Sequence, residues 1–230
     1  MARPNDIGST FEADVFADAR RDVAAGIVVF RPEPARLLAL ARAVASECGA
    51  LYIFVNAVIE AATCEALAKL GARLIRSDVN LGIGEAQNIL ALSAILDRRQ
   101  RIVLFDQDSA LTCGAVIALA EAMDRLEQTG ENPAVVGPRI MSPPGEEQRY
   151  KAPRYFPRRG RPSLPTAIPV QYVIASGSLI DLARWRRVGP MRSDFFIDAI
   201  DVEWCFRAWA RGFSCWVCPD VALSHTIGAG

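Results

Sequence analysis

The stretch IVLFDQDSA, residues 102–110, decides the fold. Four apolar residues, typical of a buried strand, lead directly into two aspartates that are separated only by Gln107. Continuous rather than alternating hydrophobicity indicates a strand buried on both faces, as in a parallel sheet covered by helices. In open α/β sheets, ligands bind beyond the carboxyl ends of the strands. We therefore expect Asp106 and Asp108 to face a binding site.

The sequence on either side alternates strand-like and helix-like segments, the pattern of an α/β domain. Strands are predicted at 26–30, 51–55, 73–75, 102–105, 134–140 and 213–219. Helices are predicted at 34–47, 61–70, 84–98, 112–128, with Thr112 as a cap, and from Asp201 to a stop at Gly212. Residues 170–182 read as two strand pieces around Ser176, Gly177 and Ser178. This order predicts a mostly parallel central sheet with right-handed crossovers and flanking helices.

We expect a mobile or loosely helical leader at 1–24 and a single domain at 25–230 that contains a long, proline-rich loop at 142–169. Segments of that length without periodicity are usually functional lids or disordered loops. The loop carries the basic run of the chain: Arg149, Lys151, Arg154, Arg158, Arg159 and Arg161. Two interpretations remain open, a solvated loop and a binder of phosphate or anionic lipid headgroups at a membrane surface.

Composition and charge limit the classes of protein to which the chain can belong. The 230 residues carry 26 Lys plus Arg and 26 Asp plus Glu, so no global field attracts nucleic acid, and we expect no nucleic-acid partner. Without a signal-like start or 18 successive apolar residues, we expect a cytoplasmic protein with no membrane span. Reduced thiols are expected, and Cys215 and Cys218 read as buried strand residues rather than zinc ligands.

The aspartates suggest chemistry. Residues two apart on a strand point the same way, about 6.6 Å apart, so Asp106 and Asp108 could share one divalent cation or divide a cation and a sugar between them. Hard oxygen ligands suit Mg²⁺ or Mn²⁺, which complete their shells with water and substrate phosphates. A second acidic pair, Asp198 and Asp201, precedes and begins the last helix. Asp201 could be an N-cap, but capping does not explain Asp198.

Several motifs together resemble a known family. In chain order they are GIVVFRPEP (26–34), NLGIGEAQN (80–88), LFDQDSA (104–110), VGPRI (136–140), ASGSLI (175–180), FFIDAIDVEWCFRA (195–208) and His225 before Gly228. Their order and coverage of 26–228 resemble family 2 glycosyltransferases with the GT-A fold, specifically the rhamnosyltransferase-like branch that adds deoxysugars to bacterial surface glycans.

The resemblance implies roles for individual residues. Asp106 and Asp108 match the family's DxD motif, so Asp108 would ligate the metal, Asp106 would contact the metal or the ribose, and His225 would lie near the metal and the diphosphate. Asp201 matches the general base that acts on the acceptor hydroxyl. The other implied donor-binding residues are Arg31, Asn56, Asn80, Gly82, Gln87, Asn88, Gln107, Ser176, Gly177 and Asp198.

Two segments depart from the family pattern. The second strand normally ends in an aspartate that helps to read the nucleotide base, whereas this chain has Val55 or Asn56 there, depending on the alignment. The first strand has Val29 and Arg31 where threonine and asparagine are usual, and Arg31 could instead meet a phosphate or the ribose. The donor base is therefore left open.

The resemblance implies an inverting, metal-dependent glycosyltransferase for bacterial surface polysaccharide synthesis. It favours L-rhamnose from dTDP-L-rhamnose as donor and a saccharide or lipid-linked saccharide as acceptor, with Mg²⁺ or Mn²⁺ as cofactor and the basic loop as a candidate contact to the inner membrane face. A UDP-sugar-dependent family 2 transferase and a degenerate, non-catalytic GT-A binding protein are the alternatives. A nucleotidyltransferase also uses paired aspartates, but the glycine-rich basic signature near the first strand is missing.

Overall fold

The computed structural model describes residues 22–141, 151 and 167–224. Within these residues nine strands form one sheet in the order β3-β2-β1-β4-β8-β6-β9-β5, with β7 (Ile168–Pro169) pairing with β9. Most of the predicted leader, His225 and every basic residue of the loop except Lys151 lie outside the described residues. Membrane contact through that loop therefore stays a prediction.

The first half of the chain forms the parallel part of the sheet. Its strands are β1 (Val23–Val29), β2 (Ala50–Val55), β3 (Arg73–Arg76) and β4 (Arg101–Asp106), which pair in parallel. The helices between them are α2 (Pro34–Ala45), α3 (Ala61–Lys69) and α4 (Gly82–Leu96). Because the strands are parallel, their carboxyl ends lie at one edge of the sheet, as the sequence predicts for a binding site.

The second half adds antiparallel strands. β8 (Leu179–Asp181) runs antiparallel between β4 and β6 (Pro133–Met141), which pairs in parallel with β9 (Ser214–Ser224). The short strand β5 (Ala110–Leu111) also pairs with β9. The helices are α5 (Ala115–Gln128), α6 (Leu182–Val188) and α7 (Ile200–Ala210), with a 3₁₀ turn η1 at Ser193–Phe195.

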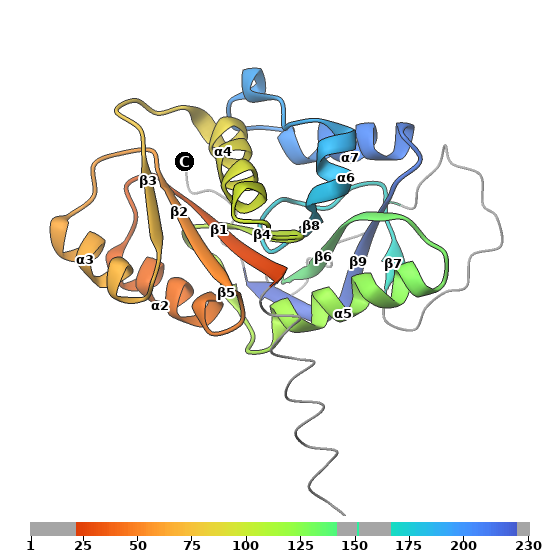
Figure 1. Cartoon of the computed structure of the whole chain (residues 1–230), viewed down its shortest axis with the longest axis horizontal. Helices are drawn as coiled ribbons and strands as arrows, with labels where there is room; N and C mark the ends of the chain where they lie inside the picture. The colour runs from red at the N-terminus through yellow and green to blue at the C-terminus, as the bar shows by residue number, and fades with distance from the viewer. Residues whose placement is uncertain (1–21, 142–150, 152–166, 225–230) are drawn as a thin grey trace, which may run out of the picture.

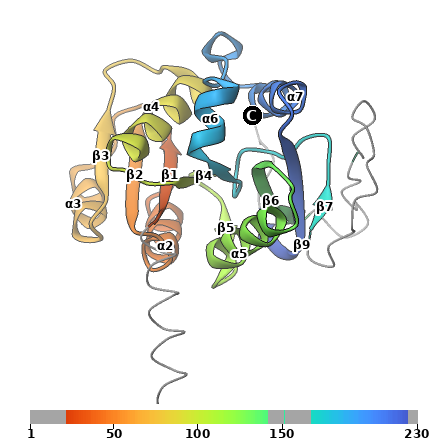
Figure 2. The ribbon, with the colours of Figure 1, turned by 45° about the vertical axis from the view of Figure 1, so that its right-hand side comes forward.

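Helices cover both faces of the sheet. α4, α6 and α7 lie on one side and α2, α3 and α5 on the other (Figures 1 and 2). Each side has its own core: Ile27 of β1 packs in the cluster of α2 and α5, and its neighbour Val28 packs in the cluster of α4, α6 and α7. Consecutive strand residues are thus buried on opposite faces, which explains the continuous apolar runs.

The structure corrects the start of α5. Thr112 is not its cap, because the helix begins at Ala115 after Gly114, whose φ is 82°. The buried carboxylate of Glu47, just beyond α2, instead accepts hydrogen bonds from the amides of Gly114 (2.8 Å) and Val116 (2.9 Å). A side chain 67 residues away in sequence therefore satisfies the donors that a local cap would serve.

Two further boundaries differ from the prediction. β1 begins at Val23, within the predicted leader 1–24. Of the two strand pieces predicted in 170–182, only β8 forms, and the segment before it is irregular. Gly177 in that segment has φ 77°, and its amide donates to the Leu104 carbonyl at 2.7 Å. The turn at Gly177 lets the backbone meet β4 without continuing as a strand.

Cys215 and Cys218 are buried free thiols on β9, in agreement with the strand interpretation of this pair. Burial raises the pKa of both thiols. In the described part of the chain, none of the helices is long and apolar enough to span a bilayer.

Candidate active site

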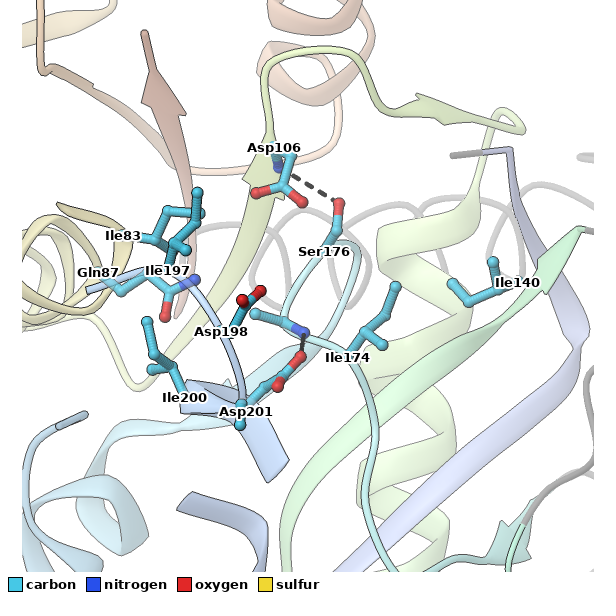
Figure 3. A pocket seen from close by; sticks show the side chains of 12 residues that line it. Ile83, Gln87, Asp106, Ile140, Ile174, Ser176, Ile197, Asp198, Ile200 and Asp201 are labelled. Carbon is cyan, nitrogen blue, oxygen red and sulfur yellow. Dashed lines mark hydrogen bonds between the residues drawn. The ribbon is translucent and has the colours of Figure 1, made fainter. Parts of the chain in front are cut away.

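A cavity of about 330 Å³ lies beside the carboxyl end of β4 (Figure 3). Four parts of the chain line it: the first turns of α4, the end of β4, the irregular segment before β8 and the loop that leads into α7. Ile140 of β6 closes a further side. Its volume is at the lower end of the range of small-molecule sites.

Asp106, the last residue of β4, is held at the cavity by serine hydroxyls. Its backbone amide donates to Ser176 Oγ at 3.2 Å, and this oxygen lies 2.5 Å from Ser109 Oγ. Both serines are buried. The Ser176 hydroxyl thus ties the end of β4 to the segment before β8, and Figure 3 shows it beside the Asp106 carboxylate.

Asp201 lies in the first turn of α7 and is fixed by two backbone amides. Its Oδ2 accepts from Ala175 N at 3.1 Å and its Oδ1 from Val202 N at 2.7 Å. Burial raises the pKa of Asp201 above that of an ordinary aspartate, although both hydrogen bonds act in the opposite direction. A carboxylate with a raised pKa binds a proton more readily, which suits a general base.

The N-cap interpretation of Asp201 is wrong. The residue at the N-cap of α7 is Ala199, whose φ of 59° places it in the left-handed region and whose side chain cannot accept a hydrogen bond. Asp201 is two residues further on, and one of its oxygens reaches out of the helix to the segment before β8. The carboxylate therefore joins two walls of the cavity.

Three carboxylates face this cavity. Asp106, Asp198 and Asp201 all line it, and Figure 3 shows their side chains arranged around one space. Asp198 is exposed, whereas Asp106 and Asp201 are partly buried. Asp106 and Asp201, which are 95 residues apart in sequence, thus line the same cavity.

The cavity also presents an unpaired acceptor and an aliphatic wall. Gln87 of α4 is 3% exposed, and its Oε1 has no hydrogen-bond partner within the described part of the chain. A buried acceptor of this kind is commonly satisfied by water or a ligand. The aliphatic side chains are Ile83, Ile140, Ile174, Ile197 and Ile200. Isoleucine is common throughout protein cores, so its occurrence in the sequence does not indicate a place in the site.

Asp108 faces a different cavity. β4 ends at Asp106 and the chain turns, so the prediction that the two aspartates point the same way along a strand is wrong. Asp108 lines a cavity of about 410 Å³ together with Arg36 and Ser224. Ser224, the residue before His225, pairs with Ala110, two residues beyond Asp108.

The donor set suits a hard cation without completing a site. Among residues 22–141, 151 and 167–224, no three His, Cys, Asp or Glu side chains are grouped to hold a metal. Asp106 and Asp108 offer carboxylate oxygens, the ligand type that Mg²⁺ and Mn²⁺ prefer, and such ions keep water and phosphate ligands. The ligand type therefore suits a magnesium or manganese ion that shares its shell with substrate, but Asp106 and Asp108 line different cavities, so a cation shared by the two stays a prediction.

Several predicted donor-binding side chains bond to the protein itself. The Gln107 amide bonds both the N–H (2.8 Å) and the carbonyl (2.9 Å) of Phe30, and thereby joins the ends of β1 and β4. The Asn56 amide bonds Leu81 N and Gly82 O. Asn80 Oδ1 accepts from Gly82 N at 2.9 Å. Donor binding by these residues stays a prediction.

Arg31 follows β1 with a φ of 49°, and its guanidinium lies 5.2 Å from the Phe30 ring centroid. The Asn88 side chain accepts a hydrogen bond from Met191 N and donates one to Met191 O. Gly177 packs against Pro138, where an added Cβ would lie 2.8 Å from Pro138 Cγ. Whether these residues also contact a donor likewise stays a prediction.

The chain resembles one curated relative. It is 28% identical to the dTDP-rhamnosyl transferase RfbF of Shigella flexneri over 155 residues, which cover 65% of this chain and 50% of that protein. The chain thus spans half the length of this relative. No protein-family model matches the chain.

Solved structures share the fold at low identity. S. aureus TarS superposes with a TM-score of 0.64 at 13% identity, covering 90% of this chain and 37% of TarS. GalNAc-T7, crystallised with UDP, GalNAc and Mn²⁺, gives 0.63 at 11% identity over 98% of this chain and 53% of that one. Glucosyl-3-phosphoglycerate synthase from Mycobacterium tuberculosis, with Mn²⁺ and UDP, gives 0.56 at 15% identity over 97% and 76%.

These matches extend over nearly the whole described sheet and its helices, and the sequence match is to a rhamnosyltransferase. The chain therefore has the GT-A fold and resembles the rhamnosyltransferase-like branch of the family 2 glycosyltransferases.

Proposed function

We propose that the protein is an inverting glycosyltransferase that moves a sugar from a nucleotide-sugar donor to an acceptor hydroxyl. The observation that carries this proposal is the Asp201 carboxylate. It is partly buried, its pKa is raised, and it lies on the wall of a cavity that also contains Asp106 at the end of β4. Three carboxylates around a small cavity are well suited to bind sugar hydroxyls and to accept a proton.

In the proposed reaction the acceptor hydroxyl donates a hydrogen bond to Asp201. As the hydroxyl oxygen forms its bond to the anomeric carbon, the proton moves to the Asp201 carboxylate. The bond from the anomeric carbon to the diphosphate breaks on the opposite face, and its electron pair leaves with the diphosphate. A single displacement inverts the anomeric centre. The amides of Ala175 and Val202 keep the carboxylate oriented during this step.

Asp108, with His225, is the proposed ligand of a divalent cation, and Asp106, which lines a different cavity, would contact the metal or the ribose. A bound Mg²⁺ or Mn²⁺ would neutralise the charge that develops on the departing diphosphate. The GalNAc-T7 and glucosyl-3-phosphoglycerate synthase structures with UDP and Mn²⁺ support divalent metal use in this fold.

L-Rhamnose from dTDP-L-rhamnose is the donor that the observations favour. The name of the Shigella relative supports it, and so does the mixed lining of the cavity. Carboxylates and Gln87 Oε1 would pair with sugar hydroxyls, while the isoleucines would contact the C6 methyl group of a 6-deoxyhexose. A hydroxymethyl group at that position would place a hydroxyl against aliphatic carbon without a partner, at a cost in affinity. The proposed acceptor is a saccharide or lipid-linked saccharide.

Thermal unfolding tests the donor site first. We expect dTDP with Mn²⁺ to raise the melting temperature, because a ligand that binds only the native state stabilises it. We expect UDP and GDP to raise it less, and Asp108→Ala to lose the metal-dependent part. A larger shift with UDP would support the UDP-sugar alternative. No shift with any nucleotide would support a non-catalytic GT-A binding protein.

Transfer is then measured by mass spectrometry. dTDP-L-rhamnose, UDP-glucose and UDP-galactose are each incubated with Mn²⁺ and a panel of aryl glycosides and lipid-linked saccharides. We expect only dTDP-L-rhamnose to give a product, about 146 mass units heavier than its acceptor, which is the increment of a deoxyhexosyl residue. A hexosyl residue would add about 16 mass units more, the mass of one oxygen atom. Hexosyl products in place of deoxyhexosyl products would refute the rhamnose assignment.

A further inference from the structure

The loop at 191–199, which carries Asp198 and leads into α7, has an unfavourable backbone conformation. Phe196 has φ 59° and ψ −58°, and Ala199 has φ 59° and ψ 12°. Residues other than glycine rarely adopt positive φ, and they keep it only where the surrounding structure holds the chain in place. Contacts outside the loop must therefore fix its conformation.

The first turn of α4 supplies such contacts. The Ile83 amide donates to the Phe196 carbonyl at 2.8 Å. A Cβ at Gly82 would lie 2.6 Å from the same carbonyl oxygen, and a Cβ at Gly84 would lie 2.9 Å from the Arg192 carbonyl oxygen. Only hydrogen atoms at these two positions let the loop backbone approach the helix so closely.

Asn88, one turn further along α4, fixes the start of the loop. Its Oδ1 accepts from Met191 N at 2.7 Å, and its Nδ2 donates to Met191 O at 3.0 Å. Asn88 is 6% exposed. Both ends of its amide thus bond Met191, Nδ2 also donates to Glu85 Oε2 at 3.4 Å, and little of the Asn88 surface remains for a ligand.

We propose that Asn88, Gly82 and Gly84 position the loop that presents Asp198 and Asp201, and do not bind the nucleotide. Asn88 is the principal positioning residue. The inference rests on the proposed function in one respect, because it takes Asp201 as the base. The same turns of α4 carry Ile83 and Gln87, which also line the cavity, so one helical segment both contributes a wall of the cavity and positions the loop before the base.

Kinetics of Asn88→Ala and Gly84→Ala test the proposal. We expect kcat to fall roughly 10- to 100-fold, because small misplacements of a reacting group have effects of this size. The donor KM and the Kd for dTDP with Mn²⁺ should stay within about twofold of wild type, because neither residue contacts the nucleotide. A Kd for dTDP that rises in step with the loss of activity would overturn the proposal and support nucleotide binding by Asn88.

Gly84→Ala guards against misfolding of the asparagine variant, because alanine favours the helix while its Cβ displaces the Arg192 carbonyl. Tyr52→Phe is the matched control. It removes the 2.6 Å hydrogen bond from Tyr52 Oη to Asp97 at the other end of α4, so it should reduce stability but leave kcat unchanged. An equal loss of kcat in Tyr52→Phe would mean that the loss in Asn88→Ala reflects general destabilisation and not the position of the loop.

Hydrogen exchange tests the same inference without sugar transfer. The amides of Ile83 and Met191 are bonded across the helix–loop contact and should exchange slowly in the wild type. Asn88→Ala should speed exchange at both positions, and Tyr52→Phe should not. Unchanged exchange in Asn88→Ala would refute the positioning role, whatever the outcome for transfer. Failure of the wild type to transfer any sugar would instead count against the proposed function.

Discussion

Asp201→Asn removes the proposed base while preserving the shape of the side chain. The loss of a general base lowers kcat by about 10²–10⁴, which corresponds to roughly 3–5 kcal/mol of transition-state stabilisation. The amide keeps one acceptor oxygen, so it can retain the bond from Ala175 or the bond from Val202, but not both. The lost hydrogen bond to a charged group costs about 1.5–3 kcal/mol.

Removal of a buried negative charge offsets that cost, because burial disfavours ionised Asp201 in the native state. We therefore expect the free energy of unfolding to change by less than about 2 kcal/mol, equivalent to a melting-temperature shift below about 8 °C. The donor should still bind, since a base does not hold the nucleotide. The assay pairs initial rates of sugar transfer with the thermal shift produced by dTDP and Mn²⁺.

Asp198→Asn is the matched control, because it removes a carboxylate from the same cavity at an exposed position. It should reduce kcat by less than about tenfold, as expected for a residue that does not accept the proton. Transfer by Asp201→Asn within tenfold of the wild-type rate would refute the base assignment. An unfolded Asp201→Asn protein would assign the carboxylate a structural role instead.

Four further predictions concern the pH dependence of kcat, the pH dependence of stability, Glu47 and Ile197. kcat should rise with pH through an apparent pKa above that of an ordinary aspartate, because protonated Asp201 cannot accept a proton; a pH–rate profile with a limb at or below the ordinary value would contradict this. The raised pKa of Asp201 also contributes stability that is present below its unfolded-state pKa and is lost as pH rises through its folded-state pKa. The free energy of unfolding of Asp201→Asn, measured in urea, should therefore depend less on pH over that window than that of the wild type. Glu47→Ala should lower the free energy of unfolding by about 2–4 kcal/mol, since the buried amide of Val116 and the partly buried amide of Gly114 lose a carboxylate acceptor, and a loss below about 1 kcal/mol in urea unfolding would count against this cap. Ile197→Ala, at an exposed position on the cavity, should raise the KM for dTDP-L-rhamnose about fivefold through the loss of roughly 1 kcal/mol of apolar contact, with an unchanged melting temperature; an unchanged KM would remove Ile197 from the sugar site.

The elements that could be predicted from sequence are those stabilised by their own residue pattern. The apolar run before Asp106 gives β4, and the helical spacing after Ile200 gives α7. The errors arise where distant contacts decide. Residues 170–175 have a strand-like composition, but the amides of Val170 and Ala175 bond Cys215 and the Asp201 side chain, and the segment does not extend β8.

The site residues likewise fall into those that the sequence predicts and those that depend on distant contacts. Parallel strand order predicts that Asp106 lies at a ligand-binding edge, and the resemblance supplies Asp201. The direction of Asp108 depends on the turn that follows β4, which two aspartates in sequence do not specify. The isoleucine wall depends on the approach of α4 to the loop before α7, a contact that no single segment encodes. Residue type thus predicts the chemistry, whereas packing determines which groups share a cavity.

The docking of the loop onto α4 has a consequence for the exchange of sugar specificity between related enzymes. Gln87 and Ile83 face the cavity from the same helical turns that hold the backbone of Phe196 and Met191. If only the cavity-facing side chains of α4 were exchanged, the loop before α7 would no longer fit the surface of the helix on which it packs. Residues 81–88 and 191–201 should therefore be exchanged as one cassette, and chimaeras that divide the cassette should fold but turn over slowly.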